Sequence, residues 1–108
     1  MNESLKTETL INCRYVKAGV KPASSIPSQN RYVDSIIHIA TEEELHSHCE
    51  YLSDEWTTVW VYKHKFLKNI IEQTPNKPKT DYDHWVLGKV FGYSDEAIGD
   101  FIDKGYHM

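Results

Sequence analysis

Long hydrophobic runs and paired cysteines are missing from this sequence. No run of about 18 apolar residues occurs anywhere in the chain, so we expect no membrane-spanning helix. The opening residues MNESLKTETLINC carry acidic groups and no apolar centre, so we expect no secretory signal. Cys13 and Cys49 are the only two thiols, and they follow no disulfide or zinc pattern. We therefore expect a cytoplasmic protein with reduced thiols and no association with membranes.

Basic residues and glycines are also scarce. Twelve Lys and Arg residues face 16 Asp and Glu residues, giving a net charge of -4, which opposes unspecific attraction to phosphate backbones. With only five glycines, the chain contains neither a P-loop nor a G-x-G-x-x-G motif. The G-x-S-x-G and H-E-x-x-H motifs of hydrolases are absent as well. We therefore expect a protein that is not an enzyme and needs no cofactor.

The remaining composition is that of an ordinary globular domain. The 108 residues are 40% hydrophobic and 26% charged, and aromatic residues make up 12%. A chain of this length buries roughly two-thirds of its unfolded surface, enough for one core without disulfides. We predict a single domain over residues 1–108.

The first 30 residues are predicted to hold one strand between two irregular segments. Residues 1–8 are polar and are expected to be frayed. Residues 9–16 alternate apolar and polar side chains, which is typical of a half-buried strand. Residues 17–30 contain Gly19, Pro22 and three serines, so we expect a long exposed loop.

The next 25 or so residues are predicted to form a strand followed by a helix. Residues 31–40 again alternate, with apolar side chains on both faces. In residues 41–52, Thr41 and Glu44 have the spacing of a capping box at a helix start. The buried stripe expected for this helix is Leu45, Cys49 and Leu52.

Residues 56–62, WTTVWVY, form the strongest predicted strand. They are β-branched or aromatic throughout, and apolar residues on both faces indicate a central strand covered on both sides. Residues 63–74 are predicted to form a helix ended by Pro75. Its expected inward residues are Phe66, Leu67, Ile70 and Ile71.

Residues 81–104 are predicted to form two short helices joined by a turn. Thr80 and Ser94 suit the two N-cap positions, and Gly92 suits the left-handed position after the first helix. The predicted order is β-β-α-β-α-α-α. This order indicates an α+β fold, a small, mainly antiparallel three-stranded sheet packed with about four helices and ending in a helix-turn-helix-like corner.

The segment LGKVFGYSDEAIGDFI resembles the DNA-binding helix-turn-helix family over about 20 residues. Gly88, Gly92 and Ile98 have the spacing of the small residue, the turn glycine and the buried aliphatic residue of that family. The resemblance implies a DNA-binding regulator that reads the major groove with its second helix. Lysines in residues 63–79 are the candidates for phosphate contacts.

The charge of this segment points to a different partner. Residues 81–103 contain six acidic residues and one basic residue, and the second helix has no Arg, Asn or Gln to read a base edge. We therefore expect an acidic face that binds another protein with a basic surface, and no nucleic acid. The predicted partner-binding residues are Tyr93, Asp95, Glu96, Asp100, Asp103 and Tyr106.

Charge is also segregated elsewhere in the chain. Residues 63–79 contain five lysines and one glutamate, whereas residues 41–55 contain six acidic residues and no Lys or Arg. This layout fits either a bipolar surface that steers partner encounter or helix faces charged for solubility. Residues 42–55 are therefore a second candidate acidic face.

Histidines near Cys49 raise the question of a metal site. On one helix, His46 would share a face with Cys49 or Glu50, and His48 lies between them in HSHCE. A structural zinc site needs four ligands, usually in close pairs, and such pairs do not occur here. We expect no bound metal, with a metal-dependent or hydrolytic enzyme kept as an alternative.

Small size and an acidic surface make the chain similar in style to accessory proteins of phages and mobile elements. Several of those proteins inhibit host nucleases by presenting carboxylates where DNA phosphates would sit. The resemblance implies an inhibitor or modulator of a host or defence protein, possibly acting by nucleic-acid mimicry. Our hypothesis is a non-enzymatic protein-binding module, and a helix-turn-helix regulator is the alternative.

Overall fold

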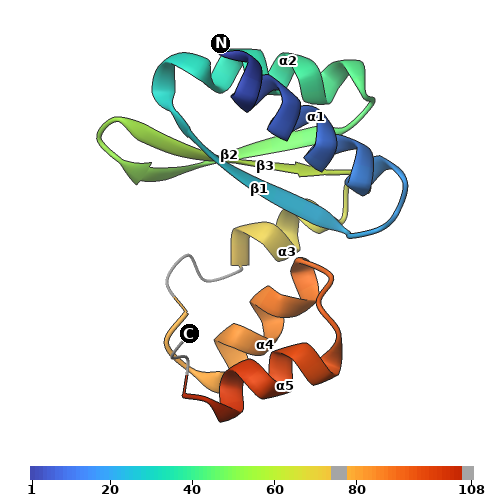
Figure 1. Cartoon of the computed structure of the whole chain (residues 1–108), viewed down its shortest axis with the longest axis vertical. Coiled ribbons are helices and arrows are strands. Elements are labelled where there is room, and N and C mark those ends of the chain that lie inside the picture. The colour runs from blue at the N-terminus through green and yellow to red at the C-terminus, as the bar shows by residue number, and fades with distance from the viewer. Residues whose placement is uncertain (74–77, 106–108) are drawn as a thin grey trace.

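The structure is a computed structural model, and it describes residues 1–73 and 78–105. These residues form an antiparallel three-stranded sheet with helices on both sides, so the predicted α+β class is confirmed (Figure 1). The predicted order matches only roughly, because a helix comes first. In chain order the elements are α1 (Glu3–Lys17), β1 (Ala23–Gln29), the 3-10 turn η1 (Asn30–Tyr32), α2 (Val33–Glu42), β2 (His46–Ser53), β3 (Trp56–Tyr62), α3 (Leu67–Gln73), α4 (Asp81–Val90) and α5 (Asp95–Asp103).

β3 is the central strand, in the order β1-β3-β2, and both neighbours run antiparallel to it. Ile26 of β1 and Cys49 of β2 both lie opposite Val59, which fixes the register across the sheet. A register shift between Tyr51 and Ser53 marks a bulge near the end of β2. The prediction that residues 56–62 form a central strand covered on both faces is confirmed.

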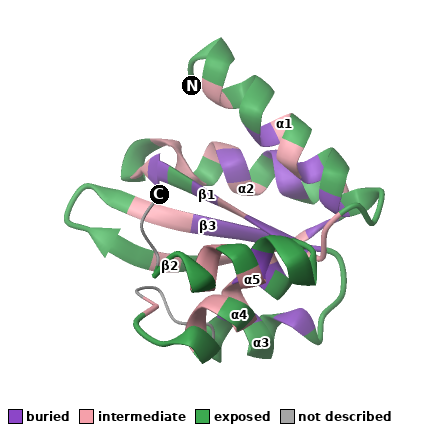
Figure 2. Cartoon of the chain, turned by 60° about the horizontal axis from the view of Figure 1, so that its bottom comes forward, coloured by how far each residue is buried: buried purple, intermediate pink, exposed green. Residues whose placement is uncertain are grey.

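Two hydrophobic clusters hold the layers together. α1 and α2 cover one face of the sheet, and the helices from α3 onward lie on the other side (Figure 1). Figure 2 shows buried residues along β3 and exposed residues on the outer surfaces of the helices. The cluster under α1 and α2 contains Cys13, Val16, Ile26, Ile36, Ile39, Ala40, Leu45, Val59 and Val61. The cluster on the opposite face contains Ala23, Trp60, Tyr62, Leu67, Ile71 and Val90.

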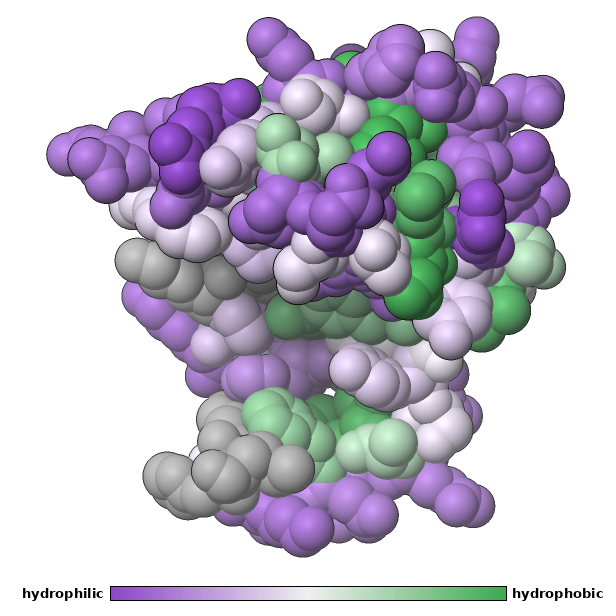
Figure 3. Space-filling model, turned by 45° about the horizontal axis from the view of Figure 1, so that its top comes forward, coloured by the Kyte–Doolittle hydropathy of each residue, from purple (hydrophilic) through white to green (hydrophobic). Residues whose placement is uncertain are grey.

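In Figure 3 the surface of the upper layer is mostly hydrophilic, but a column of hydrophobic side chains runs down it, right of centre. In Figure 3, hydrophobic side chains also gather where the molecule narrows above the C-terminal helices. Among residues 1–73 and 78–105, no helix is both long enough and apolar enough to cross a membrane.

Two predictions for the N-terminus are wrong, because most of residues 1–16 belongs to α1. The expected frayed start, residues 1–8, is helical from Glu3, and the Asn2 Oδ1 caps the helix by accepting a hydrogen bond from the Leu5 N–H at 2.8 Å. The expected strand, residues 9–16, alternates over too few residues to separate a period of 2 from a period of 3.6. The residues that α1 buries are Thr9, Cys13 and Val16.

The predicted loop over residues 17–30 is wrong in its second half, where residues 23–29 form β1. Pro27 is tolerated because β1 is an edge strand, where a missing N–H removes no ladder hydrogen bond on the open side. The Ser24 hydroxyl donates to the Asn12 Oδ1 at 2.7 Å, so this buried hydroxyl is satisfied. Pairing with β3 therefore outweighs a composition that favours turns.

The predicted strand over residues 31–40 is wrong, because this segment forms η1 and most of α2. Its apolar residues fit both an alternating pattern and a helical one, with spacings of three and four residues. The helix buries Ile36 completely, which an alternating strand would have placed on the face opposite Ile37 and Ile39. The residues that α2 buries are Ile36, Ile39 and Ala40.

The predicted helix over residues 41–52 is wrong as well. Thr41 lies in the last turn of α2, where its hydroxyl donates to the Ile37 carbonyl oxygen at 2.9 Å instead of capping a new helix. Glu44 then adopts a left-handed conformation with φ of 63°, and the chain reverses into β2.

Because most of this segment forms β2, the predicted buried helical stripe of Leu45, Cys49 and Leu52 does not exist. Leu45, just before the strand, is buried, whereas Cys49 and Leu52 are exposed. The acidic residues predicted to share a helical face are therefore divided between the end of α2, an edge strand and the hairpin. Residues 42–55 do not form one acidic helical face.

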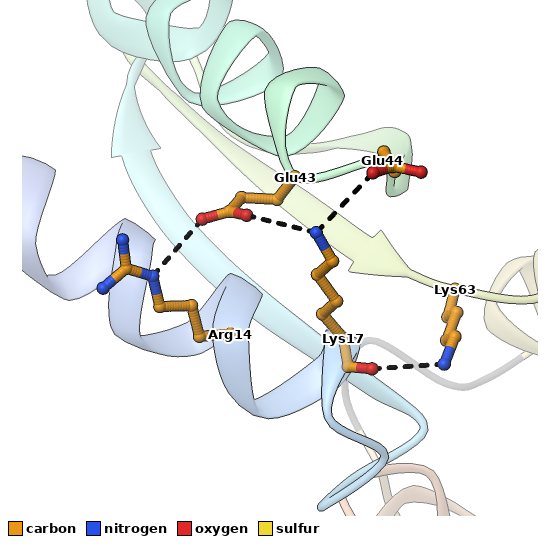
Figure 4. Close-up of polar contacts among 5 residues, drawn as sticks. All are labelled: Arg14, Lys17, Glu43, Glu44 and Lys63. Atoms are coloured by element: carbon orange, nitrogen blue, oxygen red, sulfur yellow. Dashed lines mark hydrogen bonds and ion pairs between the residues drawn. The ribbon is translucent and has the colours of Figure 1, made fainter.

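An ion-pair cluster joins the end of α1 to the turn after α2 (Figure 4). The Glu43 carboxylate accepts a hydrogen bond from the Arg14 Nε at 3.3 Å and lies 3.6 Å from the Lys17 Nζ. Lys17 also lies 3.8 Å from Glu44, and the Lys63 Nζ donates to the Lys17 carbonyl oxygen at 3.2 Å. Cations thus neutralise part of the acidic segment between α2 and β2.

The helix predicted over residues 63–74 is shorter than expected. α3 begins at Leu67, and the last predicted position lies outside the described residues. Leu67 and Ile71 are buried as predicted, but Phe66 and Ile70 are exposed.

Cys13 should make the protein less stable at high pH. Burial, with the Glu43 charge as a smaller cause, raises the pKa of the Cys13 thiol from 9.0 to about 11. Between these two values the thiol ionises in the unfolded chain but not in the folded one, so stability falls as pH rises. We expect up to about 3 kcal/mol to be lost through this group.

The measurement is urea unfolding at about pH 8 and about pH 10.5, for the wild type and for Cys13→Ala. Tyrosines and lysines titrate in both proteins, so only the extra loss in the wild type reports on Cys13. An equal loss in both proteins would show that the thiol is not buried as described.

Candidate functional site

The corner between α4 and α5 is built by local signals that the sequence analysis identified. The Thr80 Oγ1 accepts a hydrogen bond from the Asp83 N–H, and the Ser94 Oγ accepts one from the Ala97 N–H, each at 3.1 Å. Gly92 has φ of 81°, a left-handed conformation that favours glycine. These predicted caps and the predicted turn are confirmed.

Gly88 lets the two helices cross closely. A Cβ atom at Gly88 would lie 2.7 Å from the Cγ1 of Ile98, a residue that is only 4% exposed. The packing that underlies the helix-turn-helix resemblance is therefore present. At Gly92 a Cβ atom would lie 3.0 Å from the Lys21 Cβ, so the turn also packs against the loop between α1 and β1.

An apolar groove lies between α4 and α5. Its volume is about 580 Å³, and its lining is largely hydrophobic. Clefts of roughly 300–1,000 Å³ with a mostly apolar lining are large enough to hold a ligand the size of a small molecule. The groove is lined by residues of both helices and of the turn, including His84, Leu87, Phe91, Tyr93, Ala97 and Phe101.

Aromatic rings make one end of this groove continuous with the core. Phe91 stacks on Trp60 of β3 with ring centroids 5.5 Å apart, and Tyr93 meets Phe91 edge-on at 6.4 Å. Tyr93 is nevertheless 61% exposed. His84 lies in the groove, with its ring 5.2 Å from that of Phe101.

The predicted partner-binding residues that the structure describes are all exposed at this corner. They are Tyr93, Asp95, Glu96, Asp100 and Asp103. Tyr106 lies outside the described residues. The structure brings Tyr93 into the groove lining, while the four carboxylates belong to α5.

Most of the α5 carboxylates form no ion pair within the described residues. Lys89, the single basic residue between positions 81 and 103, pairs with Asp95 and also lies 5.1 Å from the Trp85 ring centroid. Glu96, Asp100 and Asp103 form no ion pair with any residue in the described part of the chain. These three carboxylates therefore give α5 a negative surface that no ion pair among the described residues neutralises.

The HSHCE segment does not form a metal site in the described part of the chain. His46, His48 and Glu50 share one face of β2, and Cys49 points to the other. Imidazole nitrogens of His48 lie 3.6 Å from Glu50 and 4.0 Å from Glu72, but no group of three potential ligands can hold an ion among residues 1–73 and 78–105.

Cys49 does not have the features of an activated nucleophile. Desolvation by the surrounding protein, with Asp34 as a smaller cause, raises the pKa of its thiol. A thiol with a raised pKa carries little thiolate at neutral pH, and the thiolate is the reactive form.

The sequence analysis did not predict the groove. Leu87, Phe91 and Phe101, which line it, were not among the predicted site residues. The available signal was the spacing of His84, Leu87 and Phe91, which places them on one side of α4.

No protein-family model matches the chain, and no curated protein or solved structure matches it either. The function must therefore be argued from the geometry and the charge of the corner.

Proposed function

We propose that this protein is a non-enzymatic protein-binding module that docks on a basic surface of another protein through α5 and the turn before it. The observation that carries the proposal is the row of exposed carboxylates on α5, three of which have no ion pair within the described residues. Such a surface raises the rate of encounter with a positively charged partner and repels negatively charged ones.

The same charge argues against reading DNA with α5. The corner has the shape of a helix-turn-helix, but α5 would bring four carboxylates toward the phosphate backbone. Affinity for DNA depends largely on replacing counterions with Lys and Arg, and α5 contains neither. Shape and charge together favour a protein that normally binds phosphates as the partner.

Inhibition by nucleic-acid mimicry is the specific form of this proposal that the charge supports. In this form the α5 carboxylates occupy the basic groove where a host or defence protein holds DNA phosphates. Duplex DNA should then compete with the module for the partner, and the competition should weaken as salt rises.

Neutralising the α5 surface should abolish partner capture. We expect a loss of at least about tenfold, because the on-rate between charged surfaces depends on these charges. The measurement is affinity capture from a lysate of the source cells, quantified by mass spectrometry. The variant combines Asp95→Asn, Glu96→Gln, Asp100→Asn and Asp103→Asn.

A control variant changes the net charge by the same amount elsewhere. Its four exposed carboxylates lie outside the corner and form no ion pair within the described residues. The control combines Glu3→Gln, Glu8→Gln, Asp34→Asn and Glu55→Gln. Equal capture by the α5 variant and the wild type would place the docking surface elsewhere, and equal losses in both variants would indicate a net-charge effect alone.

The purified protein should not shift random duplex DNA in a gel, even at low salt. The reason is the repulsion between phosphates and the α5 carboxylates. A shift that weakens with salt would favour the helix-turn-helix regulator instead. Replacing Lys63, Lys65 and Lys68 with Gln would then test whether these lysines supply the phosphate contacts.

A further inference from the structure

The groove between α4 and α5 places an apolar lining next to carboxylate side chains. Its lining is largely apolar, with Leu87 from α4, Phe91 directly after α4 and Phe101 from α5. Ile98 closes the floor where it contacts Gly88. The groove therefore offers a site for apolar side chains directly beside the charged surface of α5.

The helical period places carboxylates along the groove. Successive residues of an α-helix are about 100° apart around its axis. The groove side of α5 carries Ala97, Ile98 and Phe101, and at this period Asp100 lies about 60° beyond Ala97 and Asp95 about 60° beyond Ile98. Asp95 and Asp100 therefore flank the groove side, and Glu96 and Asp103 lie farther round, on the outer side. Asp95 already has Lys89 beside it, so Asp100 is the carboxylate most available at the groove edge.

We infer that the groove receives the apolar face of an amphipathic basic helix belonging to the partner protein. This inference rests on the proposed function and specifies what part of the partner is bound. Apolar residues at spacings of three and four along that helix occupy the groove, and Lys or Arg residues beside them face Asp100 and the outer carboxylates. The charge around an apolar site selects this occupant over an acidic or neutral helix.

Tyr93 is the residue best placed to close the site over such a helix. It lines the groove from the turn, is largely exposed, and is supported edge-on by Phe91. Exposed aromatic residues on a rigid support are frequent anchors of protein interfaces. Because Phe91 is itself stacked on Trp60, the anchor is connected to the core of the sheet.

The probe is a fluorescein-labelled peptide of about 16 residues, roughly four helical turns, built from leucine and lysine in an amphipathic pattern. Two comparison peptides separate the contribution of positive charge from that of the amphipathic pattern. One keeps the leucines and replaces every lysine with glutamate, and the other keeps the composition but scrambles the pattern. Fluorescence anisotropy with the full chain should show binding of the first peptide, at least about tenfold tighter than of either comparison peptide.

Ala97→Trp is the test of the groove. Ala97 is exposed and lines the groove, so a large side chain there fills the cavity without removing a buried contact. We expect it to weaken peptide binding at least about tenfold. Gly99→Ala is the control, because Gly99 lies two residues along α5 and about 200° round the helix from Ala97. No atom lies within 4 Å of a Cβ placed there, so this variant should bind like the wild type. Tyr93→Ala provides a second test of the same site.

The outcomes distinguish this inference from the proposed function. If the four α5 neutralisations abolish peptide binding while Ala97→Trp and Tyr93→Ala leave it unchanged, acidic docking holds and the groove inference fails. If the groove variants abolish binding and the neutralisations do not, an apolar site exists but the proposed acidic docking fails. Equal binding of the glutamate peptide, or self-association of the protein that Ala97→Trp removes, would also overturn the basic helix as occupant.

Discussion

Replacing Ile36 with alanine should lower the free energy of unfolding by about 2–5 kcal/mol. Ile36 is completely buried between α2 and the sheet, where it belongs to the same cluster as Val59 and Val61. The change removes apolar contacts and leaves a cavity that close packing around it cannot fill. Urea unfolding followed by circular dichroism measures the loss.

Ile11→Ala is the matched control, since Ile11 also lies on a helix but is 48% exposed. It should change stability by less than about 1 kcal/mol. A small effect at Ile36, combined with a large one at the neighbouring Ile37, would indicate an alternating strand over this segment instead of α2.

Gly88→Val should be the most damaging single change at the corner, costing about 1–3 kcal/mol or more. A valine Cβ would lie 2.7 Å from the Ile98 Cγ1, well inside van der Waals contact, and its two methyl groups need further space. Either the helices separate or Ile98 leaves its position. Urea unfolding measures the cost, and loss of peptide binding should accompany it if the groove is the binding site.

Gly99→Ala separates this clash from the general effect of removing a helical glycine. No atom lies within 4 Å of a Cβ placed at Gly99, so alanine there should stabilise α5 by up to about 1 kcal/mol. If Gly88→Val were as stable as Gly99→Ala, α4 and α5 would not cross at Gly88.

The C-terminal third of the fold was predictable because its signals are local. A cap at Thr80, a cap at Ser94 and a left-handed glycine at position 92 each require only a few neighbouring residues. The central strand β3 was predictable for a different reason, since its β-branched and aromatic run fits no other element.

The first half of the chain was not predictable from local pattern. The segment around Ile36 satisfies both the helical and the strand period, and only packing against the sheet decides between them. β1, with its serines and Pro27, is a strand because β3 offers a partner of matching register. Secondary structure in these segments follows tertiary contacts.

The candidate site was predictable in its charge but not in its shape. The carboxylates of α5 and the exposure of Tyr93 follow from a helix start at Ser94 and the polar pattern after it. The groove depends on how far apart α4 and α5 lie once Gly88 contacts Ile98. This distance depends on side-chain packing between two helices, and it cannot be predicted from the pattern of residues within either helix.

The central position of β3 has a consequence for the chain during its synthesis. Within residues 1–73 and 78–105, β1 and β2 each pair with β3 alone, so neither has such a strand partner until residues 56–62 have left the ribosome. Synthesis adds roughly 5–20 residues per second, so β3 follows β1 after a few seconds. During this time α1 and α2 have no complete sheet to pack against. Before β3 is made, the apolar faces of α1 and α2 have no sheet to cover. We therefore expect a chaperone to bind the growing chain most readily at this stage of synthesis.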